Sequence, residues 1–249
     1  YEFYRRRYLS DGLEVVGYMV RPKKEGKYPV IIYNRGGNRK FGKIDKDILA
    51  YFGYLAAKGY VVIGSQYRGN DGGEGEEEYG GSDINDVLNL IPLVKSLPFT
   101  KNNQIVMYGG SRGGMMTYLA IKKEADIKAA VVSSGITDVI QRYNKHNYKV
   151  KKWLRELIGG SPTEMKQEYI KRSAYYWPEK IDVPVLIVHG KFDERVNVSQ
   201  AKKLAQKLKK FNKNYKLLLY NDSHGINMPG NYRDWHKKMF DWFAKHIVN

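Results

Sequence analysis

The chain of 249 residues contains no cysteine. Disulfides and thiolate-ligated metal sites are therefore excluded, and the redox compartment is left open, with the cytoplasm slightly favoured. No apolar run approaches the roughly 18 residues that a membrane-spanning helix needs, so no membrane segment is predicted. The sequence starts with Tyr1 rather than Met. Such a start is expected after removal of a tag, a signal peptide or an upstream domain, and it does not distinguish among them.

Acidic residues are scarce: 26 Asp and Glu stand against 43 Lys and Arg, which gives a formal net charge of +17. A charge of this size is compatible with nucleic acid, a membrane surface or acidic substrates as binding partners. The basic residues are spread along the chain, however, and the dense run Lys202–Lys210 lies on a predicted amphipathic helix. A solvated, lysine-rich surface is therefore favoured. We expect neither a nucleic-acid partner nor a membrane partner, and the oligomeric state is not predicted.

Short apolar runs alternate with amphipathic segments along most of the chain. Two β-rich runs, Glu2–Leu9 and Leu13–Val20, flank a Ser-Asp-Gly turn signal and predict an antiparallel hairpin. Buried strands are predicted at Val30–Tyr33, Tyr60–Gly64, Ile105–Tyr108, Ala129–Val132, Val183–Val188 and Lys216–Tyr220. Helices are predicted at Asp47–Lys58, Ser82–Leu97, Gly113–Lys123, Ser199–Phe211 and Trp235–Ile247. This alternation predicts one α/β domain over residues 1–249, with a mostly parallel twisted sheet and helices on both faces.

One segment, Thr137–Lys180, interrupts the alternation and is rich in Tyr, Trp and Lys. It contains predicted helices around Lys151–Ile158 and Pro162–Arg172. Because ligands of open α/β sheets bind at the carboxyl ends of the strands, we expect residues 137–180 to form a small helical cap there. The cap aromatics either wall a substrate pocket or pack the cap onto the domain, and packing is slightly favoured. These aromatics are Tyr148, Trp153, Tyr175, Tyr176 and Trp177.

The strongest chemical signal is the segment Gly109-Gly110-Ser111-Arg112-Gly113, which follows a predicted strand and precedes a predicted helix. A G-x-S-x-G pattern in that context is typical of a nucleophile elbow. The glycines are required because side chains beside the strained turn would collide with the neighbouring strand and helix. The sequence therefore predicts Ser111 as a nucleophile, in preference to a purely structural turn rich in glycine.

A serine nucleophile of this kind needs an acid and then a histidine, each in a loop that follows a strand. Asp193 lies 82 residues after the nucleophile and His224 a further 31 residues on, and each follows a predicted strand. Glu194 is an adjacent rival for the acid, and His146 in the cap is a rival for the base. Ser111, Asp193 and His224 together predict a serine hydrolase that works through an acyl-enzyme.

The negative oxygen that forms during such a reaction needs two hydrogen-bond donors. One donor is expected to be the backbone N–H of Arg112, the residue after the nucleophile. The second is expected from the loop Asn34–Asn38, which follows the first predicted parallel strand and contains two glycines. Glycines allow the backbone to approach a substrate closely.

These segments together resemble the catalytic domain of the prolyl oligopeptidase (S9) family of serine peptidases, over nearly the whole chain. The supporting segments are Ser10–Leu13, Gly17–Tyr18, Gln66–Gly69, Tyr79–Val87, Gly109–Gly114 and His189–Val196. The resemblance implies an α/β-hydrolase fold and hydrolysis of ester or peptide bonds in small substrates. It implies no metal and no organic cofactor. It also implies that Arg195 contacts the substrate, because that residue matches the arginine of an Asp-Asp-Arg-Val segment in relatives.

Two features depart from the family pattern. No segment predicts the β-propeller that usually precedes the hydrolase domain. Arg35 stands where proline-cleaving relatives carry a tyrosine that donates to the oxyanion, and its loop resembles the His-Gly-Gly version of acylaminoacyl peptidases and esterases. We therefore expect the N–H of Gly36 or Gly37 to be the second donor. Arg35 is expected either to face the site or to pair with a carboxylate in Glu74–Glu78.

Arg35, Tyr67 and Trp177 are further candidates for contact with the substrate. The leading interpretation is a stand-alone serine hydrolase that cleaves small esters or short peptides and resembles the peptidases of this family. A carboxylesterase is an alternative, and so is a non-catalytic binding protein on the same fold, because a fold does not by itself determine function.

Overall fold

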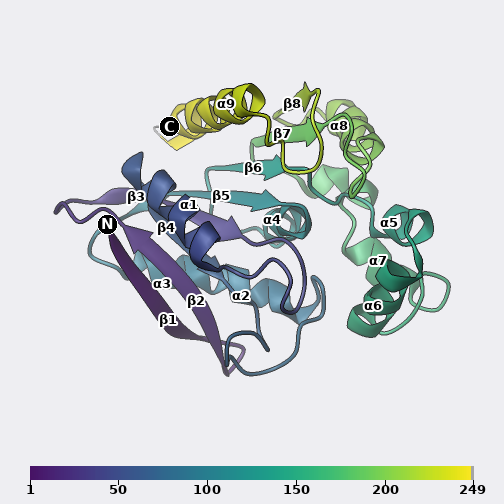
Figure 1. Ribbon diagram of the computed structural model, residues 1–249, viewed down its shortest axis with the longest axis horizontal. Helices are drawn as coiled ribbons and strands as arrows, with labels where there is room; N and C mark the ends of the chain where they lie inside the picture. The colour runs from purple at the N-terminus through teal and green to yellow at the C-terminus, as the bar shows by residue number, and fades with distance from the viewer. Residues whose placement is uncertain (248–249) are drawn as a thin grey trace.

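The structure is a computed structural model and describes residues 1–247. Its strands are β1 (Glu2–Ser10), β2 (Leu13–Arg21), β3 (Tyr28–Asn34), β4 (Val61–Ser65), β5 (Thr100–Gly110), β6 (Ala129–Ser133), β7 (Val185–Gly190) and β8 (Tyr215–Tyr220). They form one sheet in the order β1-β2-β4-β3-β5-β6-β7-β8 (Figure 1). The β1–β2 and β2–β4 pairs are antiparallel, and all other pairs are parallel. The predicted edge hairpin and mostly parallel sheet are confirmed.

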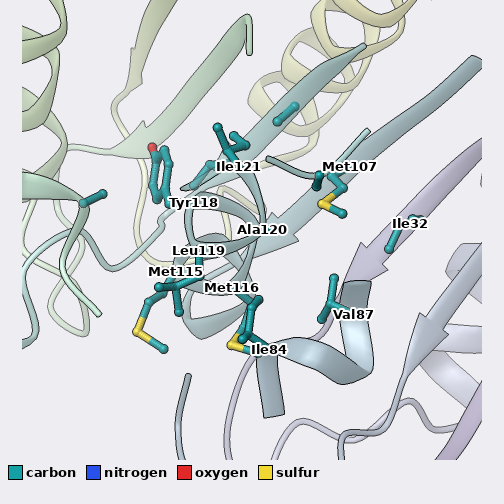
Figure 2. Packing of buried hydrophobic residues seen from close by; sticks show 14 of the residues in the cluster. Ile32, Ile84, Val87, Met107, Met115, Met116, Tyr118, Leu119, Ala120 and Ile121 are labelled. Atoms are coloured by element: carbon teal, nitrogen blue, oxygen red, sulfur yellow. The ribbon is translucent and has the colours of Figure 1, made fainter. Parts of the chain in front are cut away.

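Helices cover both faces of the sheet. They are α1 (Lys46–Ala57), α2 (Asn85–Leu88), α3 (Leu90–Lys95), α4 (Arg112–Lys122), α5 (Val139–Lys145), α6 (Tyr148–Ile158), α7 (Lys166–Lys171), α8 (Ser199–Lys210) and α9 (Pro229–Ile247). Because successive side chains of a strand point to opposite faces, Ile31 belongs to a buried cluster that includes α1 and α9, while Ile32 belongs to a cluster that includes α2, α3, α4 and α8. Figure 2 shows the second cluster, in which Met116 of α4 and Met107 of β5 are buried with Val87. The arrangement is the predicted α/β-hydrolase fold.

The prediction of one continuous helix over Ser82–Leu97 is wrong. The structure divides it into a 3₁₀ turn (Ser82–Ile84), α2 and α3. Pro92 explains the break, because a proline has no N–H for the bond to the carbonyl four residues earlier and its ring collides with that carbonyl. That carbonyl belongs to Leu88, where α2 ends.

The predicted cap segment, residues 137–180, holds α5, α6, α7 and two 3₁₀ turns, Ala174–Tyr176 and Pro178–Lys180. In Figure 1 these helices lie on the side toward which the arrows of β5 and β6 point. Asn147 caps α6 by accepting a hydrogen bond from the N–H of Val150 at 3.2 Å. Gly159 ends the helix with a φ of 94°, in the left-handed region that glycine favours. Within residues 1–247, no helix has the length and apolar character to cross a bilayer.

Candidate active site

Ser111 lies on a strained turn between β5 and α4. Its φ is 55° and its ψ is −120°, a backbone conformation that residues other than glycine rarely adopt. A Cβ atom on Gly113 would lie 1.8 Å from the carbonyl oxygen of Asn34, and one on Gly109 would lie 2.2 Å from the carbonyl oxygen of Gly113. Gly109 and Gly113 are therefore required, because the backbones pass too closely there for any side chain.

Asp193 and His224 come together in the loops that follow β7 and β8. The His224 Nδ1 atom lies 2.8 Å from the Asp193 Oδ2 atom. The other carboxylate oxygen, Oδ1, accepts from the backbone N–H groups of Arg195 and Val196 at 2.9 and 2.8 Å. With Nδ1 held by the carboxylate, the imidazole keeps Nε2 for proton transfer.

The Asp193 carboxyl group is kept ionised by its surroundings. Burial alone would raise its pKa, but hydrogen bonds from His189, His224 and the Val196 N–H outweigh burial and hold the pKa well below its usual range. An ionised carboxylate stabilises the imidazolium that forms when His224 accepts a proton. The rival acid, Glu194, is exposed, and the rival base, His146, lies 2.9 Å from the carbonyl oxygen of Arg195 rather than beside a carboxylate.

A cavity of about 500 Å³ opens over the nucleophile. Its walls come from the loop after β3, the elbow, the loop after β7 and the cap helices α5 and α6. The lining residues are Gly37, Asn38, Phe41, Tyr79, Ser111, Arg112, Arg142, His146, Val150, Trp153, Glu194 and Arg195. The cap therefore walls the space in which a substrate would meet Ser111.

The loop after β3 lies against the nucleophile. A Cβ atom on Gly36 would lie 3.6 Å from the Cβ atom of Ser111. In the described part of the chain, the N–H groups of Gly36 and Gly37 have no hydrogen-bond acceptor. Unpaired backbone donors beside a serine nucleophile are what an oxyanion hole requires. The roles of Gly36, Gly37 and Arg112 as donors stay predictions, and the geometry favours them.

The family model of the prolyl oligopeptidase family matches residues 49–249. The chain belongs to this family. It is 34% identical over 207 residues to the uncharacterized peptidase YtmA of Bacillus subtilis (strain 168), which covers 83% of this chain and 79% of that protein. It is 31% identical over 256 residues to the uncharacterized peptidase YuxL of the same organism, covering 96% of this chain and 38% of that protein.

Solved structures of other proteins share the fold of this family member. The acylaminoacyl peptidase of Pyrococcus horikoshii superposes with a TM-score of 0.83 at 24% identity, covering 99% of this chain and 42% of that one. A puromycin-hydrolyzing peptidase of Mycobacterium tuberculosis superposes with a TM-score of 0.84 at 22% identity, and the match covers 98% of this chain and 39% of that one. The chain therefore spans less than half of these proteins and of YuxL. The family assignment and the fold identify the chain as a serine hydrolase.

Three of the residues expected to contact substrate lie elsewhere, and the prediction is corrected accordingly. The Arg35 side chain is fully buried, and its Nη2 lies 3.4 Å from the Glu77 carboxylate, so the alternative of a carboxylate partner is the correct one. Tyr67 is buried beneath the loop and donates to the Arg35 carbonyl at 3.0 Å. Trp177 is buried, and the Lys122 ammonium at the end of α4 lies 4.6 Å from the centre of its ring, so Trp177 packs the cap onto the domain. Arg195 does line the cavity.

A buried ion network supports the oxyanion loop, and the sequence predicted only one part of it, the pairing of Arg35 with a carboxylate in Glu74–Glu78. The Glu77 carboxylate lies 2.8 Å from the Arg112 guanidinium and 3.4 Å from that of Arg35, and it accepts from the Arg39 N–H at 2.7 Å. Burial raises the pKa of Glu77, but the two guanidiniums outweigh burial and lower it. Arg112 also donates to the Gly37 carbonyl at 3.1 Å. The network therefore ties the loop after β3 to the residue that follows the nucleophile.

Replacing Glu77 with Gln is expected to destabilise the protein by about 3 to 5 kcal/mol, because it leaves the buried Arg35 guanidinium without its carboxylate partner. Urea unfolding at pH 7 measures this change. The matched control is Glu76→Gln, at an exposed neighbour, which is expected to change the free energy of unfolding by less than about 0.5 kcal/mol. Equal stability of the two variants would contradict the importance assigned to the network.

Proposed function

We propose that the chain is a serine peptidase that cleaves short peptides through an acyl-enzyme. The observation that carries this proposal is the hydrogen-bonded Asp193–His224 pair at 2.8 Å, in loops at the same sheet edge as Ser111 and its cavity. Two relatives are described as peptidases. A solved structure with the same fold is an acylaminoacyl peptidase in complex with Z-Gly-Gly-Phe-chloromethyl ketone.

The proposed reaction proceeds in steps that involve Ser111, His224 and Asp193. His224 takes the proton of the Ser111 hydroxyl as the Ser111 oxygen attacks the substrate carbonyl carbon. The N–H groups of Arg112 and of Gly36 or Gly37 hold the negative oxygen of the tetrahedral intermediate. His224 then gives the proton to the leaving amine, and the same steps with water release the acid. Asp193 keeps the imidazole oriented throughout.

The size of the cavity supports small substrates. A volume of about 500 Å³ accommodates a few residues of a peptide or a small acyl group, within the range usual for small-molecule pockets. The cap helices α5 and α6 close one side of the cavity, because Arg142, Val150 and Trp153 line it. Large folded proteins would have to bring an extended segment into this space.

The proposal is tested by comparing kcat/KM on acylated aminoacyl p-nitroanilides with kcat/KM on p-nitrophenyl esters of short acids. A peptidase cleaves the anilides and releases free amine, and mass spectrometry detects the acyl group on Ser111. Cleavage of esters alone would assign the chain as a carboxylesterase instead. Failure of the folded protein to react with a fluorophosphonate probe would contradict a catalytic role altogether.

A further inference from the structure

Arg142 of α5 brings a positive charge into the catalytic cavity, and in the described residues this charge has no carboxylate partner. Its Nη1 donates to the carbonyl oxygen of Arg195 at 2.9 Å, and its Nε is buried with no hydrogen-bond acceptor. Within residues 1–247, no carboxylate lies within ion-pair distance of its guanidinium. A partly desolvated cation of this kind is costly unless an anion joins it.

The contrast with the other arginines is informative. In the described part of the chain, every other arginine whose side chain is buried or half-buried forms an ion pair with a carboxylate. These arginines are Arg21, Arg35, Arg68, Arg112 and Arg172. The unpaired arginines other than Arg142 are exposed to water, which screens their charge. Arg142 is therefore the exception, and it lines the catalytic cavity.

The rest of the cavity favours an anion over a cation. Arg195 adds a second unpaired guanidinium, and Glu194 is the one carboxylate among the lining residues. Burial, followed by the neighbouring charge of Arg142, lowers the pKa of His146, so the imidazole is neutral at pH 7. Trp153 lies 5.7 Å from the Arg142 guanidinium and presents an aromatic wall beside it. An apolar stem that ends in a carboxylate matches this arrangement.

We propose that the cavity selects substrates that carry a carboxylate, which the Arg142 guanidinium binds with the help of Arg195. The inference rests on the proposed function and names the class of its substrate. The carboxylate has two possible sources: an acidic side chain on the residue whose carbonyl is attacked, or the free carboxyl terminus of a short peptide. Arginine suits both, because its planar donors match the two oxygens of a carboxylate.

Two pairs of substrates test the inference and separate the sources. The first pair is N-acetyl-Glu p-nitroanilide and its Gln counterpart, which have the same shape and differ in charge. The second is a tripeptide with a free carboxyl terminus and the same tripeptide amidated. We expect kcat/KM to favour the anionic member of at least one pair by roughly tenfold or more, the effect of one charge-assisted hydrogen bond.

Variants test whether Arg142 causes that preference. Arg142→Gln is expected to bring the ratio of the two kcat/KM values close to one, and Arg142→Lys to restore part of it, since a lysine keeps the charge without the planar donors. Arg155→Gln is the matched control, because Arg155 is an exposed cap arginine on α6 that does not line the cavity. This control removes the same net charge and is expected to keep the preference.

The outcomes separate this inference from the proposed function. Cleavage of both pairs without preference, or a preference that survives Arg142→Gln, overturns the inference and leaves the peptidase function intact. If no amide is cleaved, the peptidase function fails. The same Glu and Gln pair, offered as p-nitrophenyl esters, then decides the inference by the same ratio.

Discussion

Ser111→Ala is expected to lower kcat by roughly 10⁴ to 10⁶ on any substrate that the protein cleaves, and to abolish labelling by a fluorophosphonate. The covalent step needs an oxygen at this position, and alanine supplies none. The fold should be preserved, because the strained backbone of the elbow depends on the close approach of Gly109 and Gly113 to neighbouring backbones and not on the serine hydroxyl. Single-turnover kinetics and intact-protein mass measure the effect.

Ser134→Ala is the matched control. Ser134 follows β6, is buried, has a positive φ of 47° and has no hydrogen-bond partner for its hydroxyl. Removing that hydroxyl should leave both labelling and kcat within about threefold of the wild type, the effect of about 0.7 kcal/mol. Labelling that persists in Ser111→Ala and is lost in Ser134→Ala would refute the assignment of the nucleophile.

Asp193→Asn is expected to lower kcat by about 10⁴, since the amide reverses the hydrogen bond that orients His224. The reversal follows from the geometry. Oδ1 accepts from the N–H groups of Arg195 and Val196, so the amide oxygen of an asparagine must take that position. Its NH₂ group then points at the Nδ1 atom of His224, which must become an acceptor. The proton therefore moves to Nε2, and the imidazole can no longer accept one from Ser111.

The neighbouring carboxylate provides the comparison. Glu194→Gln changes an exposed side chain that has no ion pair or hydrogen bond to His224 in residues 1–247. Its kcat on a neutral substrate should stay within about threefold of the wild type. A near-normal rate for Asp193→Ala, together with a large loss for Glu194→Gln, would transfer the role of the acid to Glu194.

Local signals in the sequence were enough to predict most of the sheet, because buried parallel strands read as short apolar runs. They failed where backbone chemistry interrupts a pattern. The run Ser82–Leu97 keeps apolar residues at helical spacing through Pro92, and only the missing N–H of that proline divides the helix. The predicted start of β7 at Val183 is two residues early. The observed strand begins at Val185, directly after Pro184, which has no N–H to donate to a neighbouring strand.

The order of Ser111, Asp193 and His224 along the chain was sufficient to propose a serine hydrolase, since loops that follow parallel strands meet at one edge of the sheet. The sequence alone thus determined the family, the fold and the three candidate catalytic residues. The tertiary structure decided which arginines and aromatics face the cavity. Arg35 and Trp177 are buried against residues distant in sequence, whereas Arg142 is left without a carboxylate partner in the cavity. Such burial depends on contacts between separate elements, which no local pattern records.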